Sequence, residues 1–229
     1  MIPHIIHQIW LGGEPPTQVR TWLEGWRTHH PEWDHRLWTD ENRPSMRNES
    51  AFLRAPSFAM KADLLRYELL LDCGGVYIDA DFECHRAIDD LVRSRSLLLV
   101  SEFGVVCNEF IGAVAGDPFI GALVSEAGRR MMAPTDSTLA APHLLTGPYM
   151  VDEMYRRRGL AFSAPDALLP GDYFFAPRTR VASALAGALE KRYATHHALA
   201  SWREFSLGQT LRDTKLRTRL RRFLDLSSP

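Results

Sequence analysis

The stretch that decides the fold is Asp63-Leu-Leu-Arg-Tyr-Glu-Leu-Leu-Leu-Asp-Cys-Gly-Gly-Val-Tyr-Ile-Asp-Ala-Asp-Phe-Glu83. Its first half predicts a helix, because leucines recur close to helical spacing with charged residues between them. Gly74-Gly75 predicts the end of that helix, since glycine readily adopts the left-handed conformation found at helix C-termini. Val76-Tyr77-Ile78 then predicts a short buried strand, because these residues are β-branched or aromatic.

Two acids, Asp79 and Asp81, follow that strand without a gap. Side chains alternate along an extended chain, so both carboxylates are expected on one side, with roughly 6.6 Å of strand between them. That spacing lets both reach one divalent cation, and hard oxygen ligands suit Mg²⁺ or Mn²⁺. The alternative for so short a motif is a solvated turn in which the acids cap the next element.

The rest of the chain predicts further strands and helices. His7 and Gln8, in the first strand, are expected to be satisfied structural residues. The segment 42–54 is expected to be a loop with a short helix. Strands are predicted at 2–11, 34–40 and 97–100, and helices at 19–30, 57–72, 117–130 and 150–158.

Ala59-Met-Lys-Ala-Asp-Leu-Leu-Arg-Tyr67 followed by Gly74-Gly-Val-Tyr-Ile-Asp-Ala-Asp81 resembles the core of the DXD-containing glycosyltransferase family. That family includes initiating mannosyltransferases, α-1,4-galactosyltransferases and bacterial capsular and lipopolysaccharide transferases. The resemblance implies an α/β fold of the GT-A type: a single Rossmann-like domain that binds a nucleotide sugar, with a mixed, mostly parallel sheet flanked by helices. It also implies a Mn²⁺ or Mg²⁺ ion on Asp79 and Asp81, and transfer with retention of anomeric configuration.

The same resemblance implies donor-binding roles for five further residues. Asp63 would face the donor hydroxyls and Arg66 the sugar or diphosphate; the alternative is a surface ion pair between residues three apart on a helix. Trp10 would lie by the donor base, with plain core packing as the alternative. Ala59 and Tyr77 belong to the matched motifs and are expected beside the donor.

A later segment, Tyr193-Ala-Thr-His-His-Ala-Leu-Ala-Ser-Trp202, resembles the "H-H-x-x-x-S-W" ending of the family. Two carboxylates do not fill an octahedral shell, and imidazole suits Mn²⁺, so His196 or His197 is expected as a further metal ligand. A surface or satisfied core position is the alternative for both histidines. Ser201 and Trp202 would lie by the diphosphate.

The expected reaction moves a sugar from a nucleotide-diphosphate sugar, UDP- before GDP-, to an acceptor hydroxyl. Asp81, Arg66 and Asn108 are the predicted catalytic residues. Asn108 resembles an asparagine that the family presents to the sugar, and an asparagine in a turn is the alternative. A divalent ion would neutralise the charge on the departing diphosphate. Because no residue is evident as a required nucleophile, retention is expected through front-side attack.

Two other functions compete with this interpretation. One is a degenerate, non-catalytic domain that binds carbohydrate or a nucleotide sugar. The other is a metal-dependent phosphatase with Asp79 as nucleophile, which fits poorly because Asp79 lies a third of the way along the chain and Glu83-Cys84 follows. The acceptor stays open among carbohydrate, lipid-linked, natural-product and protein hydroxyls.

Length, net charge and cysteine count limit the classes of protein to which the chain can belong. A length of 229 residues most simply forms one domain, and a net charge of −1 provides no global field that would recruit nucleic acid. Three cysteines do not build a disulfide framework, which favours a reducing compartment. With no signal-peptide pattern and no long apolar run, we expect a bacterial-type cytoplasmic enzyme, soluble or peripheral at the inner membrane face.

We expect a glycosyltransferase domain at 1–205 and a basic amphipathic helix within 206–229. Residues 207–226 contain six basic and two acidic residues beside regularly spaced leucines. That composition permits docking on an anionic membrane. A helix packed on the domain with a solvated basic face is the alternative.

Overall fold

The computed structural model describes residues 1–102, 104–133, 141–157, 167–174 and 192–199. The described residues as far as Ala198 belong to one compact unit. None of the helices in this part of the chain combines the length and apolar character that a membrane span needs. The predicted boundary at 205/206 and the predicted helix at 207–226 lie outside the described residues, so both stay predictions.

A mixed six-stranded sheet forms the centre of this unit, in the order β2-β1-β3-β6-β5-β7. β1 pairs in parallel with β2 and β3, and β5 pairs in parallel with β7. β6 is antiparallel to both β3 and β5, while β4 and β8 form a separate antiparallel ribbon. The predicted mixed sheet is therefore confirmed. The bounds are β1 Ile5–Ile9, β2 Asp34–Trp38, β3 Gly75–Ile78, β4 Phe82–Cys84, β5 Leu97–Glu102, β6 Val105–Ala113, β7 Ala167–Pro170 and β8 Ala194–His196.

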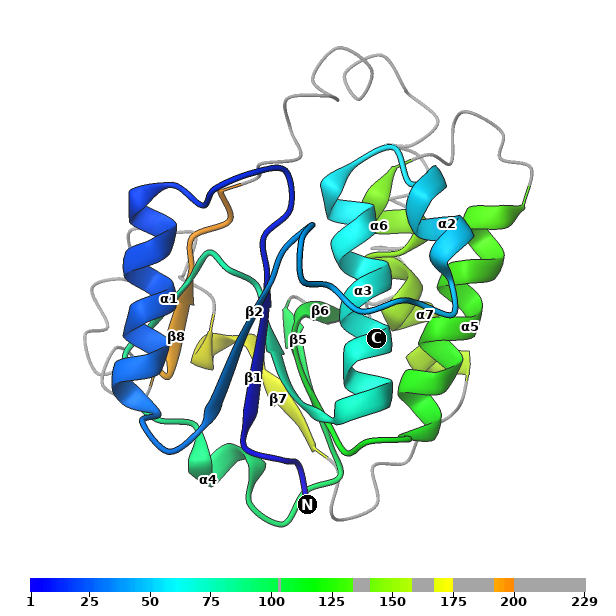
Figure 1. Ribbon diagram of the computed structural model, residues 1–229. Coiled ribbons are helices and arrows are strands. Elements are labelled where there is room, and N and C mark those ends of the chain that lie inside the picture. The colour runs from blue at the N-terminus through cyan, green and yellow to red at the C-terminus, as the bar shows by residue number, and fades with distance from the viewer. Residues whose placement is uncertain (103, 134–140, 158–166, 175–191, 200–229) are drawn as a thin grey trace, which may run out of the picture. The chain divides into compact units, whose positions relative to one another are not determined.

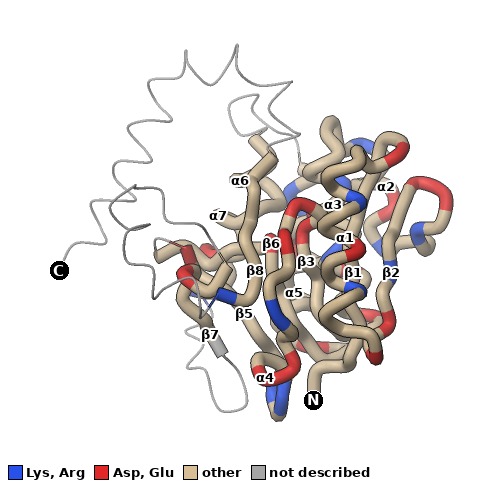
Figure 2. Tube along the Cα trace, turned by 90° about the vertical axis from the view of Figure 1, so that its left-hand side faces the viewer, with Lys and Arg blue, Asp and Glu red and all other residues tan. Residues whose placement is uncertain are grey.

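Helices cover both faces of the sheet (Figure 1). α3, α5 and α7 lie on one face, whereas α1 lies over the other face beside β4. Acidic and basic residues are interspersed along the described trace rather than gathered by sign (Figure 2). The helices are α1 Thr17–His29, α2 Glu49–Arg54, α3 Phe58–Cys73, α4 Asp89–Val92, α5 Pro118–Met132, α6 Pro142–Leu145 and α7 Pro148–Arg157, with a 3₁₀ turn at Gly171–Tyr173.

Alternate residues of the central strands serve the two faces. In β3, Tyr77 packs in the apolar cluster that contains α3, whereas Val76 and Ile78 pack with Trp26 of α1. Each face is covered, so β3 consists of buried residues throughout. This is why the strand reads as an unbroken apolar run instead of an alternating pattern.

The junction between α3 and β3 depends on two glycines. Gly74 has φ 63° and Gly75 has φ 100°, a region that residues with a Cβ rarely adopt. A Cβ on Gly74 would lie 2.9 Å from the carbonyl oxygen of Ala113, and one on Gly75 would lie 2.7 Å from that of Ile5. The glycines therefore let the chain leave α3 and enter the sheet directly between β1 and β6.

The predicted elements outside the central stretch are present with small shifts at their ends. Asp117 caps α5 by accepting hydrogen bonds from the amides of Phe119 and Ile120, at 2.8 and 3.1 Å. The expectation for His7 is confirmed, since both ring nitrogens have partners. The expectation for Gln8 is wrong, because its Nε2 is buried without a hydrogen-bond partner among the described residues.

Candidate active site

Asp79, Ala80 and Asp81 form a tight turn between β3 and β4. The amide of Phe82 donates to the carbonyl oxygen of Asp79 at 3.2 Å, which closes the turn. The extended conformation expected for this stretch is therefore wrong, although the two carboxylates do lie close enough to reach one cation. Ala80 is buried in a cluster with Trp22 of α1, so the small residue between the acids lets the turn pack on that helix.

The turn faces His196, because β4 pairs with β8 in a register that sets Phe82 opposite His196. Ligand atoms of Asp79, Asp81 and His196 all lie within 4.8 Å of one another. Nε2 of His196 is 3.2 Å from Oδ1 of Asp81, and the imidazole stacks on the Phe82 ring at a centroid distance of 4.4 Å. Two carboxylates and an imidazole around one point fit a Mn²⁺ or Mg²⁺ ion whose remaining ligands are oxygens.

The charges of this group are coupled. Burial raises the pKa of Asp79, and the Asp81 carboxylate raises it further. The charge of Arg66 lowers this pKa, but by less. Burial lowers the pKa of His196, but the hydrogen bond and charge of Asp81 outweigh burial, so the net pKa is raised. A divalent cation would relieve the repulsion between the two carboxylates.

His197 points away from this group although it is the next residue along the chain. Its Nε2 lies 2.9 Å from Oε2 of Glu83, and its ring stacks on Trp22 at 4.3 Å. The structure brings His196, and not His197, together with the two aspartates. Successive side chains of an extended segment project to opposite sides, which separates the surroundings of the two histidines.

The side chain of Arg66, a residue of α3, reaches from this helix to the aspartate turn. It is 6% exposed. Its Nη2 is 3.0 Å from Oδ1 of Asp63, and its Nη1 is 3.2 Å from Oδ1 of Asp79. The guanidinium carbon lies 4.3 Å from the centre of the Tyr77 ring, and the Tyr77 hydroxyl donates to Asp79 at 2.6 Å. The alternative of a surface ion pair between Asp63 and Arg66 is therefore wrong, and Arg66 instead ties α3 to the turn.

Asp63 and Asn108 bond to each other inside this unit. Asn108 Nδ2 donates to Oδ1 of Asp63 at 2.8 Å and to the Tyr67 hydroxyl at 3.0 Å, while the Thr146 hydroxyl donates to Oδ2 of Asp63 at 2.7 Å. Burial raises the pKa of Asp63 to about 6, although Arg66 lowers it. Asn108 lies within β6, so the alternative of an asparagine in a turn is wrong. Direct contact of Asp63 or Asn108 with a sugar stays a prediction.

The other predicted donor-binding residues lie at different places. Trp10 directly follows β1, is half-buried against the cluster that contains Ala80, and donates its amide to the carbonyl oxygen of Trp38 at 2.9 Å. Ala59 is half-buried in the first turn of α3. Ser201 and Trp202 lie outside the described residues. The roles of these residues toward a donor stay predictions.

Tyr67 and Thr146 in this network carry no assignment from the sequence, whereas Glu109 is a weaker sequence-based candidate than Asn108 for the surface that faces the sugar. The Tyr67 hydroxyl donates to the carbonyl oxygen of Thr146 at 2.6 Å across a separation of 79 residues, which no local pattern reveals. The Glu109 carbonyl oxygen accepts from the amide of Asp79 at 2.9 Å. Burial raises the pKa of Glu109, and the charge of Asp79 raises it further. Successive side chains of β6 point to opposite faces of the sheet. This alternation is the signal in the sequence that could have assigned Asn108 and its neighbour Glu109 to different surroundings.

A cavity of about 480 Å³ lies near the carboxyl ends of β1 and β2. Leu23 and Leu37 line this cavity and also belong to the apolar cluster that contains Ala80 and Trp10. Two lining residues thus share an apolar cluster with Ala80, but none of Asp79, Asp81 and His196 lines the cavity. Polar side chains that line it are Glu14, Arg20, Glu24, Arg27, Thr39, Asp40 and Glu41.

Comparison with known proteins identifies part of the chain. Residues 16–98 match the family described as glycosyltransferase sugar-binding region containing DXD motif. The chain is 32% identical over 129 residues to inositol phosphoceramide mannosyltransferase 1 of Schizosaccharomyces pombe, a match that covers 52% of this chain and 40% of that protein. The chain thus spans less than half the length of this relative, and a fungal relative gives no support to the expectation of a bacterial-type enzyme.

Solved structures show the fold. The PaToxG glycosyltransferase matches with a TM-score of 0.59 at 15% identity, covering 69% of each chain. The UDP-bound glycosyltransferase domain of the YGT toxin matches with a TM-score of 0.58 at 10% identity, covering 73% of this chain and 79% of that domain. The chain therefore has a GT-A fold, and its residues 16–98, which include the Asp79–Asp81 motif, match the DXD-containing glycosyltransferase sugar-binding family.

Proposed function

We propose that this protein is a metal-dependent, retaining glycosyltransferase that moves a sugar from a nucleotide-diphosphate sugar to an acceptor hydroxyl. The observation that carries the proposal is the meeting of Asp79, Asp81 and His196 within 4.8 Å, beside the buried guanidinium of Arg66. Three separate elements supply these groups. Their arrangement suits a ligand that brings phosphate oxygens to a divalent cation.

Asp79, Asp81 and His196 would hold Mn²⁺ or Mg²⁺, which when bound neutralises charge on the departing diphosphate. Arg66 keeps its own charge: burial lowers its pKa, but Tyr77, Asp79 and Asp63 raise it more strongly. Its position is held by Asp63 on one side and Asp79 on the other, so its charge is preorganised before a donor arrives. In front-side attack the departing phosphate itself takes the acceptor proton.

The donor and acceptor are proposed by class. A UDP-sugar is the first candidate, supported by the UDP-bound structure with the same fold. The cavity near the carboxyl ends of β1 and β2 lies where open α/β sheets bind their ligands. A lipid-linked hydroxyl is the proposed acceptor, since a relative is named for mannosyl transfer to inositol phosphoceramide.

The test is hydrolysis and binding of a donor panel by the purified chain with and without Mn²⁺: UDP-glucose, UDP-galactose, UDP-N-acetylglucosamine and GDP-mannose. We expect one donor to be hydrolysed slowly with Mn²⁺, and Asp81→Asn to abolish this. Asp72→Asn is the matched control, because Asp72 lies in the last turns of α3, 45% exposed and paired with Arg47. Metal-dependent binding without turnover would favour the non-catalytic alternative, and no binding to any donor would refute the proposal.

A further inference from the structure

The corner between α2 and α3 exposes large apolar side chains. Leu53 is 66% exposed, Phe58 is 54% exposed, and Met132, at the end of α5, is 46% exposed. Nη1 of Arg54 lies 3.8 Å from the sulfur of Met132, which joins the end of α5 to this surface. Leu53, Arg54, Phe58, Lys61 and Met132 together are called the α2–α3 corner.

Basic groups accompany these apolar side chains. The ammonium of Lys61 lies 5.9 Å from the centre of the Phe58 ring, and neither Arg54 nor Lys61 pairs with a carboxylate among the described residues. Residues 43–61 contain four basic residues and one acidic residue. Two of the four, Arg43 and Arg47, pair with carboxylates, so Arg54 and Lys61 carry the positive charge that remains beside the exposed apolar side chains.

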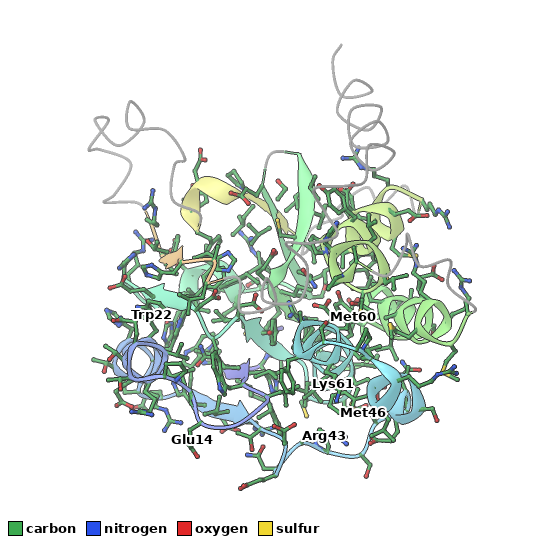
Figure 3. All side chains as sticks on the ribbon, turned by 90° about the horizontal axis from the view of Figure 1, so that it is seen from above. Glu14, Trp22, Arg43, Met46, Met60 and Lys61 are labelled. Carbon is green, nitrogen blue, oxygen red and sulfur yellow. The ribbon has the colours of Figure 1, made fainter. Side chains whose placement is uncertain are left out.

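The corner lies at the end of the sheet where the aspartate turn lies. A Cβ on Gly12, which follows β1, would come within 2.6 Å of the Phe58 ring, so Phe58 lies beside the carboxyl end of β1. The chain between α2 and α3 runs along this same end (Figure 1). Figure 3 looks down on it and shows Lys61 on α3 and Trp22 on α1, the helix that packs on the aspartate turn.

We propose that the α2–α3 corner docks on an anionic lipid surface, with Leu53 and Phe58 entering the headgroup layer and Arg54 and Lys61 facing the lipid charges. Exposed apolar side chains flanked by basic groups fit such an interface, because hydrophobic insertion and electrostatic attraction then act together. Docking through this corner would turn the aspartate turn toward the lipid. That consequence for a lipid-linked acceptor rests on the proposed function, whereas the docking itself does not.

The experiment is co-sedimentation of the full chain with phosphatidylcholine vesicles that either contain or lack phosphatidylserine, in the absence of donor. We expect binding to the anionic vesicles only, weakening with added salt. The double variants Leu53→Ser/Phe58→Ser and Arg54→Glu/Lys61→Glu should each bind more than about tenfold more weakly. The charge-matched control is Arg93→Glu/Arg157→Glu, at exposed side chains just after α4 and at the end of α7, which should bind like the parent.

Donor hydrolysis without vesicles separates this inference from the proposed function. Corner variants that keep the parent's hydrolysis and thermal unfolding but lose vesicle binding would support docking. Vesicle binding that follows the expected pattern in a chain without hydrolysis would support docking while the proposed function fails. Vesicle binding that is equal in parent and corner variants, or absent for both vesicle compositions, would overturn the inference; absent binding would point to a protein partner for this surface.

Discussion

At the scale of single residues, the positive charge of Arg66 stabilises the two carboxylates beside it. Arg66 pairs with Asp63 and Asp79 at 3.0 and 3.2 Å while its side chain is 6% exposed. Without it, the buried carboxylate of Asp63 and the partly buried carboxylate of Asp79 would lose the charge that both of them pair with. Its removal should therefore affect folding as well as chemistry.

Arg66→Ala is expected to lower the free energy of unfolding by about 3 to 5 kcal/mol, because Asp63 would be left buried and uncompensated. The control is Arg27→Ala, since the Arg27 side chain is 51% exposed and pairs with Glu24, itself 73% exposed. That loss should stay under about 1 kcal/mol. Urea unfolding measures both, with Arg66→Lys as a milder variant if Arg66→Ala does not fold. Equal losses for Arg66→Ala and Arg27→Ala would contradict the stabilising role of Arg66.

A second prediction at this scale uses Glu109 to distinguish front-side attack from double displacement, the two mechanisms that retain anomeric configuration. Its pKa is raised by burial and then by Asp79, which indicates a carboxylate near the metal-binding group. Front-side attack does not require this carboxylate, whereas double displacement needs a nucleophile. In the parent the backbone amide of Asn108 donates to Oε2 of Glu109 at 2.9 Å. Glu109→Gln keeps an acceptor for this amide, so the rate of sugar transfer should stay within about tenfold of the parent's rate.

The measurement is transfer rate at saturating donor, with Asp81→Asn as the inactive reference. A loss of about 10³-fold or more in Glu109→Gln, without a loss of donor binding, would favour Glu109 as a nucleophile over front-side attack.

At the scale of elements, β1 is joined to its neighbours by a neutral histidine. Nε2 of His7 donates to the carbonyl oxygen of Gly74 at 2.8 Å, and Nδ1 accepts from the Trp38 indole at 3.1 Å. One ring therefore connects β1 to the end of α3 and to β2. The accepting nitrogen must stay unprotonated, and burial lowers the pKa of His7 from 6.5 to about 4.

This sets a pH dependence with a definite sign. In the unfolded chain His7 binds a proton near pH 6.5, whereas the folded protein resists protonation until about pH 4. The stabilisation is present above pH 6.5 and is lost as pH falls toward about 4, on the order of 3 kcal/mol in all. Urea unfolding of the parent and of His7→Gln at several pH values should show the difference between them shrinking across this window. A constant difference would contradict the account.

At the scale of the whole molecule, the candidate active site is assembled from distant parts of the chain. Asp63 and Arg66 come from α3, Asp79 and Asp81 from the turn after β3, Asn108 from β6 and His196 from β8. These elements meet because the sheet brings β3 between β1 and β6, while the β4–β8 ribbon carries His196 to the turn.

Metal binding should therefore stabilise the folded protein as a whole. A cation that binds only the folded state raises the free energy of unfolding by about 2.7 kcal/mol at a hundredfold excess over its Kd. We expect Mn²⁺ to raise the Tm of the parent and of His197→Ala, but to have little effect on His196→Ala. Thermal unfolding with and without Mn²⁺ measures this. The same Tm response in the two histidine variants would argue against His196 as a ligand.

The sequence by itself determined the local features: the helix, glycine junction, strand and acids of Asp63–Glu83, the capping of α5 by Asp117 and the succession of strands and helices. Helical periodicity, glycine conformation and capping act between near neighbours, so they are legible in order along the chain. The resemblance of its motifs to the DXD-containing family also predicted the GT-A fold and the residues around Asp79 and Asp81.

Only the tertiary structure decided how those residues meet. It closed Asp79–Asp81 into a turn, brought His196 rather than His197 to the aspartates, and joined Asp63 to Thr146 across a separation of 83 residues. It also buried the Asp63–Arg66 pair, which the sequence left open between surface and site. The reason is physical: strand register and contact between distant elements are set by packing of the whole unit, and no local spacing encodes them.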